Sequence, residues 1–572
     1  MTAIAKDQLK PYALGHLGLA GAFIRECGLI DKIDSLIPKE SNNAGHFTHG
    51  QVVVLMILNG LGYTTCPLYM SNTFFDAKDV EAMLEFEYHS SWFNDDVIGR
   101  TMDAMYRYGL TPLFSELALN IMNTLGCKVG SVNIDSTSFH YHGREQMYHE
   151  DNSKVDYDEP HKINVTYGYS RDAHPELVQV MEQMMVDNAT GIPLYMEPES
   201  GNTNDTNAFG RMTKIFESFK KYTDDGYLYL CGDSALYSKK NVTHMSESGI
   251  KFVTRAADGN LNSVQKFIAE HRNDELEEID DVNQGGIYEV EDCGIKQKWL
   301  LVHSDTAESR NVHSVESFAQ KELLRLQKKI KEYGKSCFSC EPDAQKEIER
   351  FSKNFRYCKL VSSGIVKEEI PRRGRKPKAL VPEEEKQYHY KIELEIGINQ
   401  EYCDMVRRNR SFFVVATNDV EREWKPAELL KQYKSQNRVE RGFRFLKDPE
   451  FFADSIFVSK NEYIQALLMI MTFGLAVFSG LESKLRNPMK ESNVQLPNQT
   501  GKLTDKITMR YVFQIFSTVI TIVLNNGERL FYHISEQANI IQELLGDKLK
   551  GFKNIRTICN STLNNSIKFR RL

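Results

Sequence analysis

The most informative stretch of the chain is YKSQNRVERGFRFLK, from Tyr433 to Lys447. It places a single carboxylate in a cation-rich, amphipathic pattern. Tyr433, Glu440 and Lys447 follow one another at intervals of seven residues. On a continuous α-helix with about 3.6 residues per turn, these three side chains stack along one face. We therefore predict one helix over this stretch, with Glu440 in the middle of that face.

A second stripe of the same stretch is apolar. Val439, Phe443 and Leu446 have the i, i+4, i+7 spacing of a helix face that packs on a core. Residues 425–447 also carry seven Lys/Arg against two Glu. Such a helix is either a solvated charged surface or the support of a carboxylate that binds a metal ion beside a phosphate backbone. The choice depends on partners for Glu440 elsewhere in the chain.

Length and composition indicate an ordinary soluble protein with several cores. The chain has 572 residues, of which 41% are hydrophobic and 26% charged, and single cores rarely grow past roughly 250–300 residues. No basic-then-apolar signal pattern opens the chain, so secretion is not expected. The most apolar run, Ala466 to Leu481, is shorter than the roughly 20 residues of a membrane-spanning helix. We predict a buried helix there and no membrane partner.

The ten cysteines do not form a regular framework. Cys337 and Cys340 make the only CxxC, and no second pair follows at zinc-ribbon spacing. Reduced thiols in a cytoplasmic protein are therefore favoured over a structural zinc site.

The net charge of −7 argues mildly against a nucleic-acid partner, but the charges are segregated. Residues 258–292 carry eleven Asp/Glu and two Lys/Arg, whereas residues 548–572 carry seven Lys/Arg and no acid. Local patches control electrostatic steering, so the global sign is weak evidence. The basic tail could bind DNA ends or simply fray.

The pattern along the chain predicts a mixed α/β sheet behind a helical region. Apolar residues at helical spacing run from Leu9 to about Gly126. Alternating or buried-type segments then predict strands at 131–143, 163–170, 177–187 and 227–233, with a hairpin from 177–187 through DNATG into IPLYMEPESGN. A helix over SKKNVTHMSESG and a strand over IKFVTRA follow.

Residues 256 to roughly 420 break this rhythm and predict an insertion. It contains an acidic stretch, a long charged helix from about Ser314 to Tyr333, and a linker-like segment, PRRGRKPKALVPEEEK. Four strands are expected in it, over GIYEV, QKWLLVHS, HYKIELEIGI and SFFVVATND. After Pro426 the chain becomes helical again through Leu485, and a second helical, then basic, region covers about 503–572.

Two aspartates are candidate partners of Glu440. Asp135 lies within the first predicted strand, and Asp233 ends the later buried strand. Each alone is more typical of a turn or an N-cap. If the three carboxylates converge, they would hold two divalent ions roughly 3.5–4 Å apart, as in-line phosphoryl transfer requires. Oxygen ligands of this kind favour Mg²⁺, with Mn²⁺ as a substitute, over zinc.

Several motifs, in this order, resemble the DDE transposases of bacterial insertion sequences. They are NIDSTSF around Asp135, GYSRD at 168–172, GNTND at 201–205, CGDSALYS around Asp233, FVTRA, and the stretch that opens at Tyr433. The last is similar to the group whose third motif reads Y-x2-R-x3-E-x6-K. KPYALGHLGLAGAFIRECGLIDKID near the N-terminus resembles the helical domain that precedes the catalytic core in one branch. The likeness spans most of the chain.

The resemblance implies an α/β fold: a ribonuclease H-like mixed sheet core interrupted by a β-rich insertion, with helical N-terminal and C-terminal regions. The expected parts are an N-terminal domain for end binding or dimerisation, two halves of the core around the insertion, and a basic C-terminal region. Their predicted bounds are 1–128, 129–257, 258–420, 421–490 and 491–572.

By the same resemblance, Asp135, Asp233 and Glu440 are the catalytic, metal-binding residues, and Tyr433 and Lys447 contact DNA phosphates. One position departs from the family: Gln436 stands where the motif has Arg. Gln carries no charge, so a bidentate phosphate clamp is lost there. Arg438 is displaced around the helix and cannot simply substitute, whereas Arg444, one turn beyond Glu440, could.

Two other features allow more than one interpretation. Arg373 and Arg375, within RRGRKP, are typical either of a hook that enters the minor groove of A·T-rich DNA or of a flexible basic linker. His140, His142 and His149 near Asp135 more often mark an exposed strand edge than a metal cluster. A site role for His140 or His142 stays open.

The expected function is that of a cytoplasmic DNA transposase that acts on the terminal inverted repeats of its element and on target DNA. It would cleave the element ends and join their 3′ hydroxyls to the target by two-metal chemistry, as a homodimer on paired ends. Two alternatives remain: a metal-dependent nuclease without strand transfer, and an inactive, transposase-derived DNA-binding protein.

Overall fold

The chain forms two compact units in the computed structural model, one of Met1–Thr254 with Gln432–Leu572 and one of Arg255–Lys431. The division into the five parts expected from the sequence remains a prediction. The structure describes residues 9–39, 45–62, 70–141, 162–169, 174–203, 216, 219, 223, 228–256, 262–333, 336–353, 355–370, 387–448, 455–456, 460–524 and 527–546.

The first unit is built on a mixed sheet with the strand order β4-β3-β2-β5-β6. β2, β3 and β4 are antiparallel, while β5 and β6 run parallel to β2. This is the mixed core predicted for a ribonuclease H-like fold. The strand bounds are Ser131–Tyr141 for β2, Gln179–Asp187 for β3, Pro193–Ser200 for β4, Tyr229–Gly232 for β5 and Lys251–Arg255 for β6.

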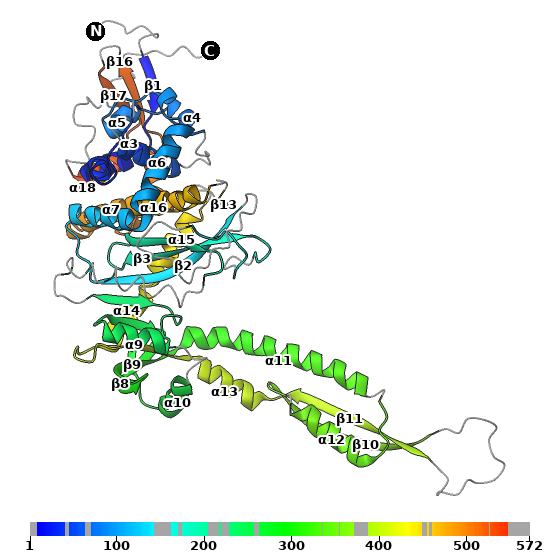
Figure 1. The fold of residues 1–572 in the computed structure, drawn as a ribbon. Coiled ribbons are helices and arrows are strands. Elements are labelled where there is room, and N and C mark those ends of the chain that lie inside the picture. Colours follow the sequence, from blue (N-terminus) through cyan, green and yellow to red (C-terminus); the bar gives the residue numbers. More distant parts are fainter. Residues whose placement is uncertain are drawn as a thin grey trace, which may run out of the picture. The chain divides into compact units, whose positions relative to one another are not determined.

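The β3–β4 hairpin confirms the turn signal in DNATG. The Asp187 side chain accepts hydrogen bonds from the backbone of Ala189 and Thr190 and from the Thr190 hydroxyl. Gly191 follows with φ +78°, a left-handed conformation that favours glycine. Both strands are buried along their whole length, and helices lie over one face of the sheet (Figure 1).

One predicted strand does not form. Residues 163–170 were expected to pair, but in the described part, 162–169, only Thr166 bridges to Gln179. The reason is competition for the edge of β3. β4 already pairs with β3 as far as Val180, so only Gln179 is left for Thr166. The segment then passes so close to Gly201 that a Cβ at Gly168 would lie 1.9 Å from the Gly201 carbonyl oxygen.

The N-terminal region is mostly helical, as predicted. Its third helix begins with a reciprocal capping box between Thr48 and Gln51, which satisfies two backbone N–H groups at the helix start. The helices are α1 Leu17–Glu26, α2 Leu29–Leu36, α3 His49–Gly60, α4 Ser71–Asp76, α5 Val80–Leu84, η3 Ser90–Trp92, α6 Asp95–Tyr108 and α7 Leu110–Thr124.

The long apolar helix α16, Asn461–Glu491, is a core helix. It is long and apolar enough to cross a membrane by composition, yet 89% of its most apolar window is buried within the protein. It packs against α3, α6, α7 and β4. The predicted buried helix is therefore confirmed and extends beyond the expected run at both ends.

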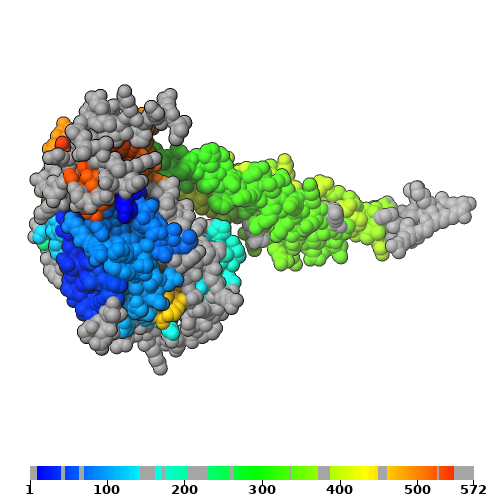
Figure 2. Space-filling model, turned by 90° about the horizontal axis from the view of Figure 1, so that it is seen from above, coloured from blue at the N-terminus to red at the C-terminus, as the bar shows by residue number. Residues whose placement is uncertain are grey.

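The two ends of the chain also form a small sheet that the helical pattern did not indicate. β1, Leu9–Ala13, pairs antiparallel with β16, Ile520–Leu524, which pairs with β17, Arg529–Tyr532 (Figure 1). In Figure 2 the C-terminal segments (orange) lie beside the N-terminal residues (blue). The other elements here are β14 Leu496–Pro497, β15 Leu503–Thr504, α17 Met509–Phe516 and α18 Glu536–Leu545.

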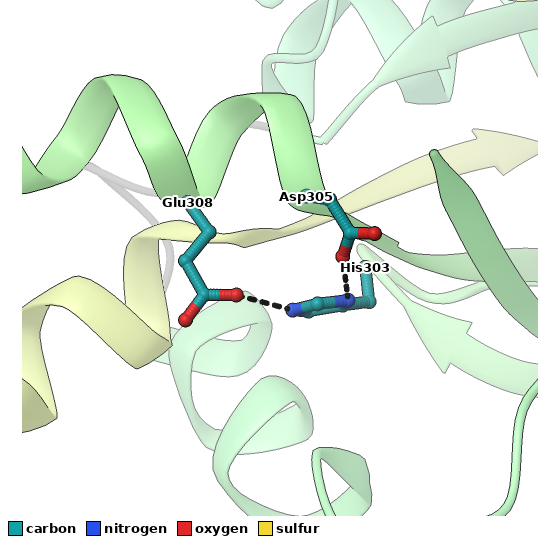
Figure 3. Close-up of side chains that lie close together, drawn as sticks. All are labelled: His303, Asp305 and Glu308. Atoms are coloured by element: carbon teal, nitrogen blue, oxygen red, sulfur yellow. Dashed lines mark ion pairs between the residues drawn. The ribbon is translucent and has the colours of Figure 1, made fainter. Parts of the chain in front are cut away.

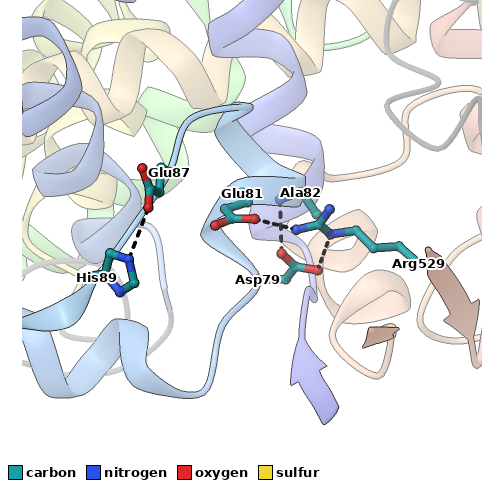
Figure 4. Close-up of polar contacts among 6 residues, drawn as sticks. All are labelled: Asp79, Glu81, Ala82, Glu87, His89 and Arg529. Atoms are coloured by element: carbon teal, nitrogen blue, oxygen red, sulfur yellow. Dashed lines mark hydrogen bonds and ion pairs between the residues drawn. The ribbon is translucent and has the colours of Figure 1, made fainter. Parts of the chain in front are cut away.

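An ion-pair network joins β17 to the N-terminal helices (Figure 4). Arg529 contacts the Asp79 carboxylate at 3.0 Å and the Glu81 carboxylate at 2.8 Å. Asp79 also caps α5 by accepting from the Ala82 N–H at 3.0 Å. The Asp79 carboxylate is nearly buried. Its contact with Arg529 joins residues that are 450 positions apart in sequence.

The second unit contains the predicted strands of the insertion and more helix than expected. β7 Glu277–Asp280, β8 Asn283–Asp292, β9 Ile295–Ser304 and β12 Phe412–Thr417 form antiparallel pairs in the order β12-β9-β8-β7. α11 begins at Asp305 rather than near Ser314, and ends at Tyr333 as predicted. The helices that the pattern did not indicate are α10 Asn262–His271, α12 Glu341–Ser352 and α13 Gln400–Arg410.

A two-stranded ribbon completes this unit. β10, Cys358–Glu369, pairs antiparallel with β11, Tyr388–Ile398. α11 and α12 cover one face of the ribbon through small apolar clusters, for example Leu326 with Phe351 and Cys358. Residues 371–386, which join the two strands, lie outside the described residues.

Candidate active site

Asp135 lies within β2, and Asp233 directly follows the parallel strand β5. The last paired residues of the two strands are Asn133 and Cys231, so each aspartate comes two residues beyond the end of this pairing. Residues two apart on a strand point to the same face. Asp135 therefore leaves the sheet on the same side as Asn133, and Asp233 begins the loop at the C-terminal end of β5.

The sheet opens beside Asp135. The edge of β2 that faces β5 pairs with it only over Ser131–Asn133, and pairs again with β13, Ser455–Ile456, at His140 and Tyr141. The chain order also reverses here, since β3 lies on one side of β2 and β5 on the other. Such a switch point, at the carboxyl ends of parallel strands, is where open α/β sheets bind ligands.

Local hydrogen bonds hold both aspartates. Asp135 Oδ1 accepts from the Ser136 N–H at 2.7 Å, and Asp233 Oδ1 accepts from the Ala235 N–H at 2.9 Å. The Thr254 hydroxyl on β6 donates to the Asp233 carbonyl at 2.7 Å. Asp135 is half-buried and Asp233 exposed, so both can meet a ligand from solvent while their backbones are fixed.

The continuous helix predicted over Tyr433–Lys447 is wrong. α14, Pro426–Lys434, and α15, Asn437–Leu446, are separated by a turn at Ser435 and Gln436. The reason is tertiary: the Asn133 side chain on β2 donates to the Ser435 carbonyl at 2.7 Å. In a continuous helix the Ser435 carbonyl would accept from the N–H of residue 439. Here the N–H of residue 439 donates to the Gln436 carbonyl instead. The predicted single helix is therefore broken between Tyr433 and Glu440.

α15 runs along β2 in the same direction. Its start is held at Asn133 through Ser435, and at its end the Lys447 ammonium lies 5.8 Å from the Phe139 ring. The two paths agree in length, at about 18 Å of helix and about 20 Å of strand. From Ser435 to Glu440 the helix rises about 7.5 Å, close to the roughly 6.6 Å from Asn133 to Asp135. Glu440 thus comes level with Asp135.

Glu440 lies on the solvent-facing side of α15 and is exposed. The opposite side is packed: a Cβ at Gly442 would lie 3.0 Å from Leu475 Cδ2 and 3.2 Å from Met184 Cε. Met184 pairs with Asp135 across β3 and β2, so α15 covers the face of the sheet from which Asp135 projects. Asp135 thus lies on the sheet face that α15 covers, while Glu440 leaves that helix on its solvent-facing side.

The three carboxylates do not form a closed cluster. Among the described residues, only His303, Asp305 and Glu308 bring three ligand atoms within 4.8 Å of one another (Figure 3). In that group Asp305 contacts His303 Nδ1 at 3.6 Å and Glu308 contacts Nε2 at 3.4 Å. Because the carboxylates face different ring nitrogens, the group fits an ion-paired histidine better than a single-ion site. Asp135, Asp233 and Glu440 supply only oxygen donors and are open to solvent, which fits Mg²⁺ or Mn²⁺.

The predicted DNA contacts are distributed as follows. Gln436 precedes α15, Arg444 is exposed on its last turn, and Lys447 is half-buried at its end. Tyr433 is half-buried on α14. Arg373 and Arg375 lie outside the described residues.

Arg438 points elsewhere, as expected. Its guanidinium would lie 3.6 Å from a Cβ at Gly191 in the β3–β4 turn. Partial burial lowers its pKa from the usual value, and Asp187 acts in the opposite sense. Arg438 therefore supports the hairpin and is not available to replace an arginine at 436.

The remaining candidates do not add ligands in the described chain. The His140 ring is half-buried at the end of β2 and lies edge-on to the His174 ring, 5.4 Å away. His142 and His149 lie outside the described residues. Cys337 is exposed and Cys340 partly exposed, and neither belongs to a group of three ligands within the described residues.

Two family models match the chain. Residues 132–476, more than half of the chain, match the family described as Transposase DDE domain, and residues 9–119 match Domain of unknown function (DUF4277). The chain belongs to the DDE transposase family. The first match begins with β2 and continues into α16, so it spans all three candidate carboxylates of this transposase.

Other comparisons are weaker. No curated protein matches the transposase significantly. Among solved structures, the piggyBac transposase in a synaptic complex with hairpin DNA aligns with 98% of this chain and 86% of its own. The sequence identity is 9% and the TM-score 0.34, so the likeness carries no argument about the site.

The transposase also holds a second set of acids that the sequence did not reveal, on β3 and β4. Glu182 is fully buried, and burial raises its pKa to about 8 although the Thr472 hydroxyl on α16 contacts it. Burial likewise raises the pKa of Asp187, against the hydrogen bonds from Thr190. Glu197 and Glu199 are buried too, and the Tyr195 hydroxyl contacts Glu197. The burial of these four acids could have been predicted only if both faces of β3 and β4 had been expected to be covered.

Proposed function

We propose that this DDE transposase cuts the ends of an insertion sequence and joins them to target DNA, with Asp135, Asp233 and Glu440 as its catalytic carboxylates. The observation that supports the proposal is the pairing of β2 with β5, which ends two residues before Asp135 and Asp233, while α15 runs along β2. The proposal brings the three acids together at the switch point of the sheet, where ligands bind.

The three carboxylates would hold two divalent cations, Mg²⁺ or Mn²⁺. When bound, such ions supply the positive charge that activates an attacking oxygen and stabilises a leaving oxygen in phosphoryl transfer. The chain's own contribution is rigidity. Backbone N–H groups fix the Asp135 and Asp233 side chains, and the hydroxyl of Thr254 fixes the backbone after β5.

The chemistry consists of two phosphoryl transfers. A water molecule attacks the phosphodiester at the element end, which breaks the P–O3′ bond and leaves a 3′ hydroxyl and a 5′ phosphate. That hydroxyl then attacks a phosphodiester of the target, forms a new P–O bond and releases a target 3′ hydroxyl. No covalent enzyme intermediate is required, because water and then the 3′ hydroxyl attack phosphorus directly. The same carboxylates serve both steps.

Cations on the last turns of α15 would position the DNA. Arg444 and Lys447 are exposed or half-exposed on the helix that carries Glu440, and phosphate contacts of this kind set the register of a nucleic acid without reading its sequence. Gln436 can donate a hydrogen bond there but lacks a charge. A dimer on paired ends, in the cytoplasm, is part of the proposal because both ends must be processed together.

Strand transfer with defined ends tests the proposal. The DNA that flanks the gene supplies the terminal inverted repeats, and the purified full-length protein is incubated with pre-cut ends, a target plasmid and Mg²⁺. We expect joined products from the wild type and none from Asp233→Asn, with end binding retained by the variant. Cleavage of uncut ends without joining would indicate a nuclease.

The inactive alternative is tested by metal binding. Calorimetric titration with Mn²⁺ should show binding to the wild type that Asp233→Asn weakens. A wild type that binds the ends but neither takes up Mn²⁺ nor cleaves DNA would contradict the proposal and favour a DNA-binding protein without catalysis.

A further inference from the structure

We propose that Asn133 is a positioning residue that sets the place of Glu440 relative to Asp135 and Asp233. The inference rests on the proposed function of the three carboxylates and concerns how the fold brings the third one to the other two. Asn133 lies on β2, two residues before Asp135, and is fully buried.

The contact between Asn133 and the turn before α15 is reciprocal. Asn133 Nδ2 donates to the Ser435 carbonyl at 2.7 Å, and the Ser435 hydroxyl lies 3.4 Å from Asn133 Oδ1. The same hydroxyl contacts the Gln432 carbonyl in the last turn of α14. Ser435 is thus held from the strand on one side and from α14 on the other.

A second contact lies in the same row of the sheet. Cys231 on β5 pairs in register with Asn133 and precedes Asp233 by two residues. Its sulfur accepts from Gln432 Nε2 at 3.5 Å. The residue two positions before each aspartate therefore touches the end of α14, and on β2 Asp135 lies on the same face of the sheet as Asn133.

Asn188 completes the arrangement from the β3–β4 turn. Its side chain contacts the Asn133 amide and donates to the Ser131 hydroxyl at 2.7 Å. The two N–H groups of Asn133 are thereby assigned, one to Asn188 and one to Ser435. An aliphatic side chain at 133 would fill the space but would leave the Ser435 carbonyl without this donor.

The consequence for Glu440 follows from helix geometry. The Ser435 carbonyl accepts from the Asn133 amide at 2.7 Å and from the Arg438 N–H at 3.0 Å. Loss of the amide lets this carbonyl shift to the residue 439 N–H, which is the bond that merges α14 and α15 into one helix. Each residue of helix turns by about 100°, so repairing the break changes the direction in which Glu440 projects. The buried amide therefore favours the broken helix and, with it, one orientation of Glu440.

The inference is tested by the affinity for Mn²⁺, measured by calorimetry on the full chain without DNA. Asn133→Asp keeps the size of the side chain but replaces its donor by an acceptor, and Asn133→Ala removes both. We expect each to weaken Mn²⁺ binding by about 10-fold or more, the range found when a residue that orients a metal ligand is lost. The Mg²⁺ concentration for half-maximal cleavage should rise in parallel, while end binding without metal stays within about twofold.

Two further variants keep the test independent of folding. Asn59→Ala removes another buried asparagine, which donates to the Ser71 hydroxyl at 3.2 Å among the N-terminal helices, and should lower the melting temperature with unchanged Mn²⁺ affinity. Gln432→Ala removes only the Cys231 contact of a half-buried side chain, and should shift the Mn²⁺ affinity in the same direction as Asn133→Ala by a smaller factor.

The outcomes separate this inference from the proposed function. If Asp233→Asn abolishes Mn²⁺ binding and cleavage but the Asn133 and Gln432 variants bind Mn²⁺ like the wild type, the positioning role of Asn133 is wrong and the catalytic assignment stands. If Asp233→Asn itself has no effect on Mn²⁺ binding or cleavage, the proposed function is wrong.

Discussion

The first unit carries two sets of carboxylates that differ in their exposure to solvent. Asp135, Asp233 and Glu440 are exposed or half-buried, and Asp135 and Asp233 are bound by nearby backbone N–H groups. On β3 and β4, four acids are buried, and burial raises the pKa of Glu182 to about 8 and also raises that of Asp187. Only a few residues separate the two sets along the sheet.

Under the proposed assignment, a strongly shifted pKa does not mark the catalytic group in this protein. A perturbed carboxyl in a cleft is a reasonable first candidate for a site, and that criterion would select Glu182. A carboxylate that binds divalent cations must instead be ionised and open to the ligand. Position at the switch point therefore separates the two sets better than the pKa does.

The largest difference in cleavage rate is expected between a substitution in the exposed set and a substitution in the buried set. Asp135→Asn should lower end cleavage by more than about 10³-fold, the scale seen when a member of a catalytic group is removed. Glu182→Gln should leave cleavage within about threefold, since the neutral amide matches the protonated acid that burial favours at neutral pH. Gel assays of both proteins at equal end occupancy make the comparison. Equal losses would mean that the two sets are not functionally distinct.

The second prediction concerns pH and stability. The Glu182 pKa is raised from 4.5 to about 8 in the folded protein, so its stabilising contribution is complete below pH 4.5 and is lost as the pH rises towards 8. The slope is about 1.4 kcal/mol per pH unit in this window. Glu182→Gln does not titrate, and its amide oxygen can still accept from the Thr472 hydroxyl.

Thermal unfolding of the wild type and Glu182→Gln between pH 5 and 8 measures this difference. We expect the melting temperature of the variant to gain on that of the wild type as the pH rises. A constant difference across the range would show that Glu182 ionises normally in the folded state.

The third prediction concerns the packing that separates the two sets. Gly442 lets α15 approach Leu475 and Met184, so Gly442→Val should push α15 outward and cost about 1–3 kcal/mol by overpacking. Cleavage should fall as well, because Glu440 moves with the helix. Gly364→Val is the control: a Cβ at Gly364 would meet nothing within 4 Å. Denaturant unfolding and cleavage assays distinguish the two variants.

The smallest effect on DNA binding is expected at Gln436, which stands near Glu440 in the sequence where the family's motif has an arginine. Gln436→Arg adds a cation at the start of α15 and should tighten end binding a few-fold, with a salt dependence steeper by about one charge. Gln499→Arg adds the same charge to an exposed position on another segment and should leave the salt slope unchanged. Fluorescence anisotropy over a range of salt concentrations measures both, and an unchanged slope for Gln436→Arg would exclude a phosphate contact there.

Much of the fold could be predicted because its signals are local. The β3–β4 hairpin follows from a turn that Asp187 and Gly191 stabilise by themselves. The predicted helix over SKKNVTHMSESG forms as α9, Lys239–Glu247, which Ser238 caps and which is followed by Gly249 with φ +65°. The strand expected at 163–170 and the small sheet of β1, β16 and β17 could not be judged locally. In both cases, pairing depends on which strand reaches a free edge. β4 already occupies the edge of β3 beside 163–170, and β1 pairs with a strand that is far away in sequence.

The sequence by itself determined the chemical composition of the site: two aspartates at strand positions, one glutamate on an amphipathic, cation-rich segment, and a glutamine in place of the family's arginine. Only the tertiary structure decided how Glu440 is presented. Periodicity predicts one helix through Ser435, because no residue type within the segment signals a break. In the structure the Ser435 carbonyl accepts from the Arg438 N–H and from the buried amide of Asn133, 302 residues earlier in the chain, where α15 meets β2.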